Sequence, residues 1–241
     1  MRRTSSLLAV EGPDFMGMIE HQATMLVELV RSATDVLHGR ESAHSLRLLD
    51  LEQRREELQR RHRAAVDSIV GQAAGLDEIH GTIDILDRAA AGLFQLAHGF
   101  QQMLSKPDEA TSQMMAAIRR ASESLQQAYQ RLANGATIAE SDVDAATGSV
   151  NVLRHYRQQG LREALDHSDR HAVVAPAGRN PVGCAFRLYD RYEKLDDIAQ
   201  ELASAGVVLR RWSRRLSVYP ICSGTEIGSR RSLLRQQKIV N

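Results

Sequence analysis

The segment DEIHGTIDILDRAAAGLFQLAHGFQQML, residues 77–104, decides the fold class of this chain. Its apolar side chains recur at three- and four-residue steps, in the series Ile79, Ile83, Leu86, Ala90, Leu93, Ala97 and Phe100. Residues with this spacing share one face of an α-helix, and such a face has to pack against other elements. The segment is therefore predicted to be an amphipathic helix in a core made of helices.

Five further segments show the same periodicity. We expect them at about 14–37, 41–70, 108–134, 141–166 and 181–215. Ser105, Pro107 and Asp108 indicate a helix start, and Asn134-Gly135 a helix end. The 41–70 stripe passes through Arg55 and His62, which makes this the most charged helix. Gly148 and Gly160 are expected to weaken the fifth helix by about 1 kcal/mol each relative to alanine.

Short connections between such helices favour antiparallel neighbours. The prediction is an all-α protein, a six-helix antiparallel bundle built from two three-helix repeats. The repeats are expected at about 14–104 and 107–215, after an N-terminal arm at 1–13. Residues 216–241 are predicted to be a disordered basic tail, with contact to an anionic membrane surface as the alternative.

Composition excludes several function classes. Aromatic residues make up 4% of the chain, which suits helix packing better than sheet packing. The 31 basic and 30 acidic residues leave a net charge of +1, so nucleic acid is not an expected partner. Cys184 and Cys222 show no disulfide framework, and no apolar run approaches 18 residues, so a cytoplasmic protein is expected. There is no Walker or GxSxG motif, and no enzymatic activity is predicted.

Five stretches carry a family resemblance: PDFMGMIEHQATMLVELV (13–30), LEQRREEL (51–58), IDILDRAA (83–90), VNVLRHYRQQGLREAL (150–165) and YEKLDDIAQELASAGVVL (192–209). They resemble the PhoU-like family, in the branch of phosphate transport regulators that accompanies Pit-type inorganic phosphate permeases. The resemblance implies six helices in two repeats and a regulatory protein that docks on the cytosolic face of such a permease. Some members of the family bind multinuclear iron or other divalent metals through Glu/Asp-x-x-x-Asp motifs.

Carried over residue by residue, the motif gives a set of candidate metal ligands. They are Glu52, Glu56, Asp84, Asp87, Glu193, Asp196 and Asp197. Carboxylates four residues apart share a helix face and can supply hard oxygen ligands.

The acidic motif is incomplete in this chain, however. Arg54 and Arg55 stand within the second-helix motif, Ile83 takes the first acidic position of the third, and Gln200 follows Asp196 by four residues. In the fifth helix Arg154, His155 and Arg157 replace carboxylates. Because a fixed guanidinium repels a cation, no cofactor is expected, and a divalent metal or iron remains the alternative.

Alternative interpretations of these residues stay open. For His80, Asp84 and Asp87 they are a solvated helix flank, a residual metal site, or an ion pair with the Arg54/Arg55 region. For the whole chain they are a metal-binding, di-iron-type bundle, or a structural module that forms a homodimer. Glu41-x-x-His44 has the spacing of half a di-iron site, but the chain has no second copy.

Overall fold

The computed structural model describes residues 14–68, 76–102, 107–134, 140–171 and 181–218. For 76–77, 165–171, 181–185 and 213–218 it describes the backbone alone. Six α-helices make up these ranges, without a strand among them: α1 Phe15–Leu37, α2 Leu46–Asp67, α3 Leu76–Gln101, α4 Glu109–Ala133, α5 Glu140–His171 and α6 Pro181–Val218. The all-α, six-helix prediction is confirmed. The predicted arm at 1–13 and the tail beyond Val218 lie outside the described residues.

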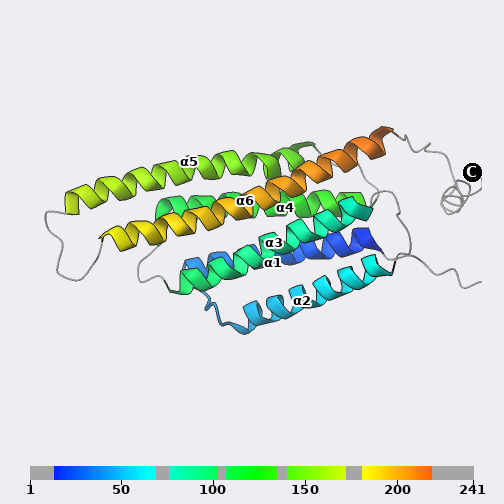
Figure 1. Ribbon diagram of the computed structural model, residues 1–241, viewed down its shortest axis with the longest axis horizontal. Helices are drawn as coiled ribbons and strands as arrows, with labels where there is room; N and C mark the ends of the chain where they lie inside the picture. Colours follow the sequence, from blue (N-terminus) through cyan, green and yellow to red (C-terminus); the bar gives the residue numbers. More distant parts are fainter. Residues whose placement is uncertain (1–13, 69–75, 103–106, 135–139, 172–180, 219–241) are drawn as a thin grey trace, which may run out of the picture.

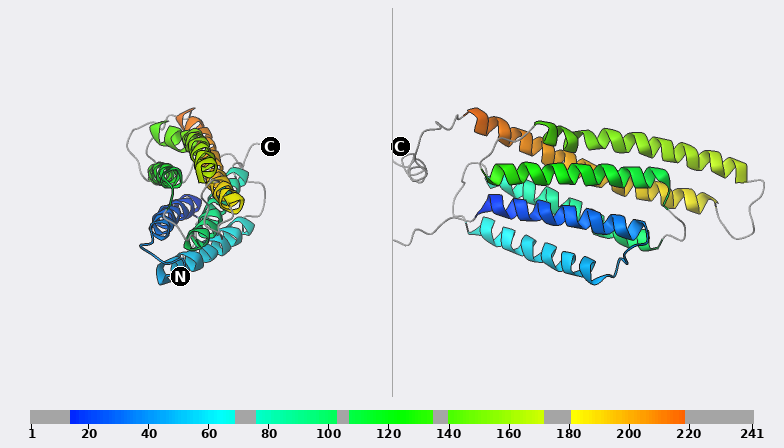
Figure 2. Two further views of the ribbon diagram at one scale, coloured as in Figure 1. Left: turned by 90° about the vertical axis from the view of Figure 1, so that its left-hand side faces the viewer. Right: turned by 180° about the vertical axis from the view of Figure 1, so that it is seen from behind.

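Each helix runs antiparallel to the next one along the chain (Figure 1). Helices α1, α3, α6 and α4 form a four-membered ring in which α1 packs on α3 and α4, and α6 packs on α3 and α4. Helix α2 lies outside this ring on α1 and α3, while α5 lies outside it on α4 and α6, as the end-on view in Figure 2 also shows. The second helix of each predicted triplet is therefore the outer one. That the two triplets are an internal repeat stays a prediction.

The apolar stripe of the quoted segment lies in the core as predicted. From Ile83 to Phe100 its members are at most 5% exposed, and Ile79 packs against them. The predicted stripes of α1, α4 and α6 meet it, with Leu26, Ile118 and Leu202 among the fully buried side chains. Burial of one such side chain contributes about 1.5–3 kcal/mol, so these four stripes supply most of the driving force for folding.

Two close contacts in this bundle depend on glycine. A Cβ on Gly92 of α3 would lie 2.9 Å from Ile198 of α6. A Cβ on Gly160 of α5 would lie 2.2 Å from the Tyr192 hydroxyl of α6. Gly160 is therefore a packing requirement as well as the weak helix former that the sequence suggests.

The second helix begins later than predicted. The expected start was near Glu41, but α2 begins at Leu46, and Ser45 is its N-cap, accepting a hydrogen bond from the Leu48 amide at 3.2 Å. Glu41 and His44 lie in the preceding connection, where the Glu41 carboxylate accepts hydrogen bonds from Ser32 (2.6 Å) and Ser45 (2.5 Å). Capping at Ser45 satisfies an otherwise unpaired helical amide, which fixes the start there.

The ends of α1 and α4 lie where the sequence predicts, whereas α5 and α6 are longer than predicted. Helix α1 ends in a Schellman motif, with Gly39 at φ 69°, its amide bonded to the Val36 carbonyl, and the Arg40 amide bonded to the Asp35 carbonyl. Asn134 caps α4. Helices α5 and α6 run past the predicted ends, to His171 and Val218, so the backbone of residues 216–218 is helical. No described helix has the length and apolar character needed to cross a bilayer.

Candidate functional site

The carboxylates predicted on α3 face two different environments. Asp87 is 8% exposed and is held by α2: its two oxygens accept hydrogen bonds from Arg55 at 2.8 and 3.2 Å, and Gln59 donates a third at 2.9 Å. Asp84 is half exposed and lies 3.3 Å from the Nδ1 of His80 on its own helix. Asp87 therefore forms an ion pair with Arg55, one of the three alternatives left open by the sequence, whereas His80 and Asp84 form a local pair on the surface.

The carboxylates predicted on α6 are held in the same way by an arginine of α5. One nitrogen of Arg157 donates a hydrogen bond to Glu193 at 2.9 Å, and the other lies 3.6 Å from Asp196. The Tyr189 hydroxyl also donates to Glu193, at 2.8 Å, and the Arg157 guanidinium lies over the Tyr189 ring, 5.1 Å from its centroid. These contacts fix the guanidinium between two of the candidate ligands.

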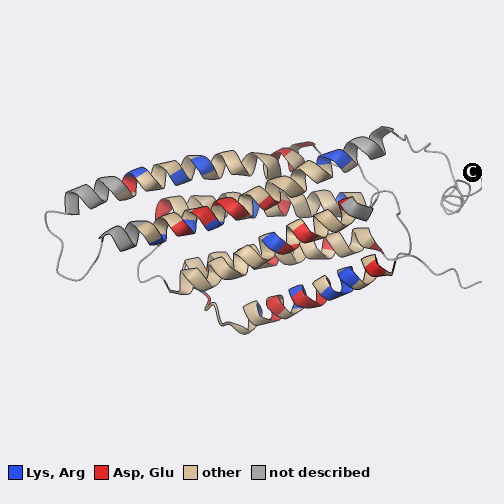
Figure 3. Ribbon diagram, viewed as in Figure 1, with Lys and Arg blue, Asp and Glu red and all other residues tan. Residues whose placement is uncertain are grey.

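The remaining candidate ligands, Glu52, Glu56 and Asp197, lie outside both of these charge clusters. Glu56 is exposed and Glu52 half-buried on α2, and neither forms an ion pair with a described side chain. Their neighbour Arg54 instead contacts Glu28 of α1 at 2.6 Å and Asp50 at 3.1 Å. Asp197 is exposed on α6. Figure 3 shows that acidic and basic residues are interspersed along the ribbon of α2.

A related electrostatic arrangement occurs in both halves of the bundle. An arginine of the outer helix, Arg55 on α2 or Arg157 on α5, compensates a carboxylate of the adjoining ring helix, Asp87 on α3 or Asp196 on α6. In the part of the chain that the structure describes, no three His, Cys, Asp or Glu side chains gather closely enough to hold one ion. Arg55 bonds Asp87 through two nitrogens, whereas Arg157 bonds Glu193 and lies 3.6 Å from Asp196, whose buried Oδ1 has no hydrogen-bond partner among the described residues. Both guanidinium groups are permanently charged and link two helices.

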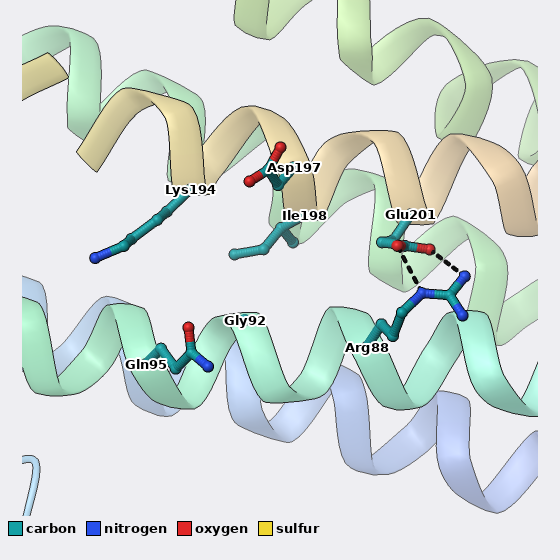
Figure 4. A pocket seen from close by; sticks show the side chains of 7 residues that line it. All are labelled: Arg88, Gly92, Gln95, Lys194, Asp197, Ile198 and Glu201. Atoms are coloured by element: carbon teal, nitrogen blue, oxygen red, sulfur yellow. Dashed lines mark hydrogen bonds and ion pairs between the residues drawn. The ribbon is translucent and has the colours of Figure 1, made fainter. Parts of the chain in front are cut away.

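Asp197 borders a shallow groove between α3 and α6. Figure 4 shows Arg88 of α3 reaching across to Glu201 of α6, with two hydrogen bonds of 2.8 and 2.9 Å, and Gly92 facing Ile198. The groove encloses about 120 Å³. Sites for small organic ligands usually enclose about 300–1,000 Å³, so this groove is a charged helix seam and too small for an organic cofactor.

Asp108 is the centre of a polar network that the sequence did not suggest. It caps α4, accepting hydrogen bonds from the Thr111 amide (2.8 Å) and hydroxyl (2.6 Å). From α6 it also receives the Tyr192 hydroxyl at 2.8 Å and Arg191 at 3.0 Å. Burial pushes the pKa of Asp108 up, but the Thr111 and Tyr192 hydrogen bonds and the Arg191 charge together hold it below its usual value. Because this carboxylate remains ionised at neutral pH, it joins the start of α4 to α6.

The sequence contained part of this signal. Asp108, together with Ser105 and Pro107, predicted where this helix begins, but its bonds to Thr111 were not part of that prediction. Nothing in the spacing pointed to Arg191 and Tyr192, which are 83 and 84 residues further along the chain. Ser105, the other predicted capping residue, lies outside the described residues.

Comparison of the chain with protein-family models and with curated proteins gives no match. The PhoU-like resemblance therefore stands on the five sequence stretches and is a prediction.

Proposed function

We propose that this chain is a non-enzymatic, PhoU-like accessory protein of inorganic phosphate transport that acts by docking to a Pit-type permease at the cytosolic face of the membrane. The PhoU-like resemblance is the basis for proposing a role in inorganic phosphate transport. The observation that carries the mode of action is that arginine compensates the best-buried candidate ligands, Asp87 and Asp196. This favours recognition by surfaces over metal chemistry, since each carboxylate already has a fixed cationic partner.

The docking surface is proposed on the outer faces of α2 and α6. Helix α2 exposes Leu46 (86%) and Leu49 (45%) among its charged residues, and α6 exposes Phe186 (71%) and Val207 (50%). Large apolar side chains surrounded by charges are common at the centre of protein–protein contacts. Both helices lie on the periphery of the bundle over at least part of their length, so a partner can reach them without unfolding the core (Figure 1).

The docking proposal predicts that the tagged full chain captures a phosphate permease from detergent extracts of its native membranes. Mass spectrometry identifies the captured protein. Leu46→Asp places a charge on the proposed contact and is expected to lower the captured amount about tenfold, the effect of a modest interface hot spot. Val152→Asp is the matched control, since Val152 is 38% exposed on α5, away from the proposed surface. Extracts in which the wild-type chain captures no permease contradict the proposal.

The arginine–carboxylate pairs also predict that the purified protein contains little metal. Protein purified from cells supplemented with iron, manganese and zinc is expected to contain far less than one ion per chain by elemental analysis, because binding a cation would require displacing a guanidinium. One ion per chain, lost in the Asp87→Asn or Asp196→Asn variant, would establish the alternative metal-binding function. Glu109→Gln is the control, because Glu109 is exposed at the start of α4 and is not a candidate ligand.

A further inference from the structure

Helix α2 is attached to the bundle differently from the other helices. Its buried residues are Leu48, Leu51 and His62, whereas α1, of almost the same length, buries twelve. Both buried leucines lie in the first two turns. Beyond Leu51, Leu58 is the only apolar side chain of α2 that packs on the core, and it is partly buried. The apolar attachment of α2 is therefore concentrated at its N-terminal end.

The N-terminal end is also tied by hydrogen bonds. In the connection that leads into α2, the buried Ala43 donates its amide to the Gln101 side chain of α3 at 2.9 Å. Glu41 in the same connection bonds Ser32 of α1 and the N-cap Ser45. These contacts hold the start of α2 against both helices on which it lies.

From Arg54 onward, α2 meets α1 and α3 mainly through polar groups. Arg55 and Gln59 donate to Asp87 of α3. Arg54, one position earlier, pairs with Glu28 of α1. Water can replace such hydrogen bonds when a helix moves away, so their net contribution is small compared with that of buried apolar contacts.

His62 further weakens the contact of α2 with α1 and α3. The residue is 1% exposed, and neither ring nitrogen meets hydrogen-bond geometry with a described group, although the Met18 backbone lies near enough to influence the pKa of the ring. On α1, the Oε1 atom of the buried Gln22 is also without a partner, although its Nε2 donates to the Ile83 carbonyl at 3.0 Å. Burial lowers the pKa of His62, so the ring is neutral at pH 7 and carries one N–H donor. An unpaired buried donor is unfavourable, and exposure to water removes that cost.

From this geometry we infer that residues 52–67 of α2 form a strap that lifts from α1 and α3 as a unit, with its hinge next to the anchored Leu51, while the four-helix ring and α5 stay folded. Opening hydrates the imidazole, the part-buried Arg55–Asp87 pair and the exposed Arg54–Glu28 pair, and it uncovers Asp87 and Gln22, whose polar groups water can satisfy. The inference concerns the bundle itself and does not depend on the proposed function.

Amide hydrogen exchange on the full chain at pH 7 tests the strap. We expect protection factors from Arg55 to His62 at least about tenfold below those in the middle of α1, α3 and α4, because local opening adds to global unfolding in the strap alone. Protection as high in Arg55–His62 as in the middle of α4 would mean that α2 exchanges by global unfolding, and would overturn the inference.

Two variants test whether His62 and the Arg55–Asp87 pair control the opening of the strap. His62→Leu replaces the unpaired imidazole by an apolar side chain and is expected to raise protection in residues 55–62 about tenfold. His155→Leu makes the same change at an exposed position of α5 and should leave α2 protection unchanged. Asp87→Asn weakens the Arg55 pairing and is expected to lower protection in residues 55–62, with α4 as the internal reference. Unchanged or lower protection in the His62→Leu variant would refute the role assigned to His62.

Discussion

Replacing Gly160 by alanine is expected to destabilise the protein by about 2–3 kcal/mol, although the same change stabilises most helices. Alanine adds up to about 1 kcal/mol of helix stability over glycine. Here, however, its Cβ would lie 2.2 Å from the Tyr192 hydroxyl and 2.7 Å from the Ala110 Cβ. Tyr192 is fully buried and bonded to Asp108, so its ring cannot move aside freely. Overpacking at such a site costs about 1–3 kcal/mol, and loss of the tyrosine hydrogen bond adds to it.

Thermal and urea unfolding measure this effect against a control in the same helix. A Cβ on Gly148 would meet nothing within 4 Å, so Gly148→Ala is expected to stabilise the protein by about 0.5–1 kcal/mol. Tyr192→Phe removes the oxygen in the shortest contact, so Gly160→Ala should cost less in that background. Equal stability changes for Gly160→Ala and Gly148→Ala would show that α5 and α6 do not approach as closely as described.

Replacing Asp108 by alanine is expected to cost about 3–5 kcal/mol at pH 7. The substitution removes an N-cap, worth about 0.5–2 kcal/mol, and leaves the buried Tyr192 hydroxyl without its acceptor, at about 1–3 kcal/mol. It also leaves Arg191, whose side chain is 16% exposed, without its carboxylate. Chemical denaturation followed by circular dichroism measures the loss.

Asp14 provides the matched control for Asp108. It caps α1 by accepting a hydrogen bond from Gly17 at 3.0 Å, but it is exposed and is not linked to another described helix. Asp14→Ala should therefore cost about 1 kcal/mol, the value of a cap alone. Similar losses for the two variants would mean that the link from Asp108 to α6 adds nothing.

The same network gives α4 and α6 a defined response to acid. Since the folded pKa of Asp108 is lowered, its contribution is fully present above the ordinary carboxyl pKa and is lost as pH falls through the lower folded value. The stability difference between wild type and Asp108→Ala should thus be constant at neutral pH and shrink only in strong acid.

The sequence places arginines among the expected acids of the candidate site. Two of them, Arg55 and Arg157, lie beside Asp87 and Asp196 in the structure. The sequence could not select these two among several arginines. Arg54, adjacent to Arg55, points to α1 and Glu28 instead, because successive residues of a helix project about 100° apart.

The sequence by itself determined the helices, their apolar faces and their approximate ends, because periodicity, caps and helix-breaking residues act over a few neighbouring positions. Only the tertiary structure decided that α2 and α5 lie outside the ring, that Gly160 makes room for Tyr192, and that Asp108 joins α4 to α6. Those facts depend on which helix faces meet, and residues more than thirty positions apart carry no local pattern that records their contact.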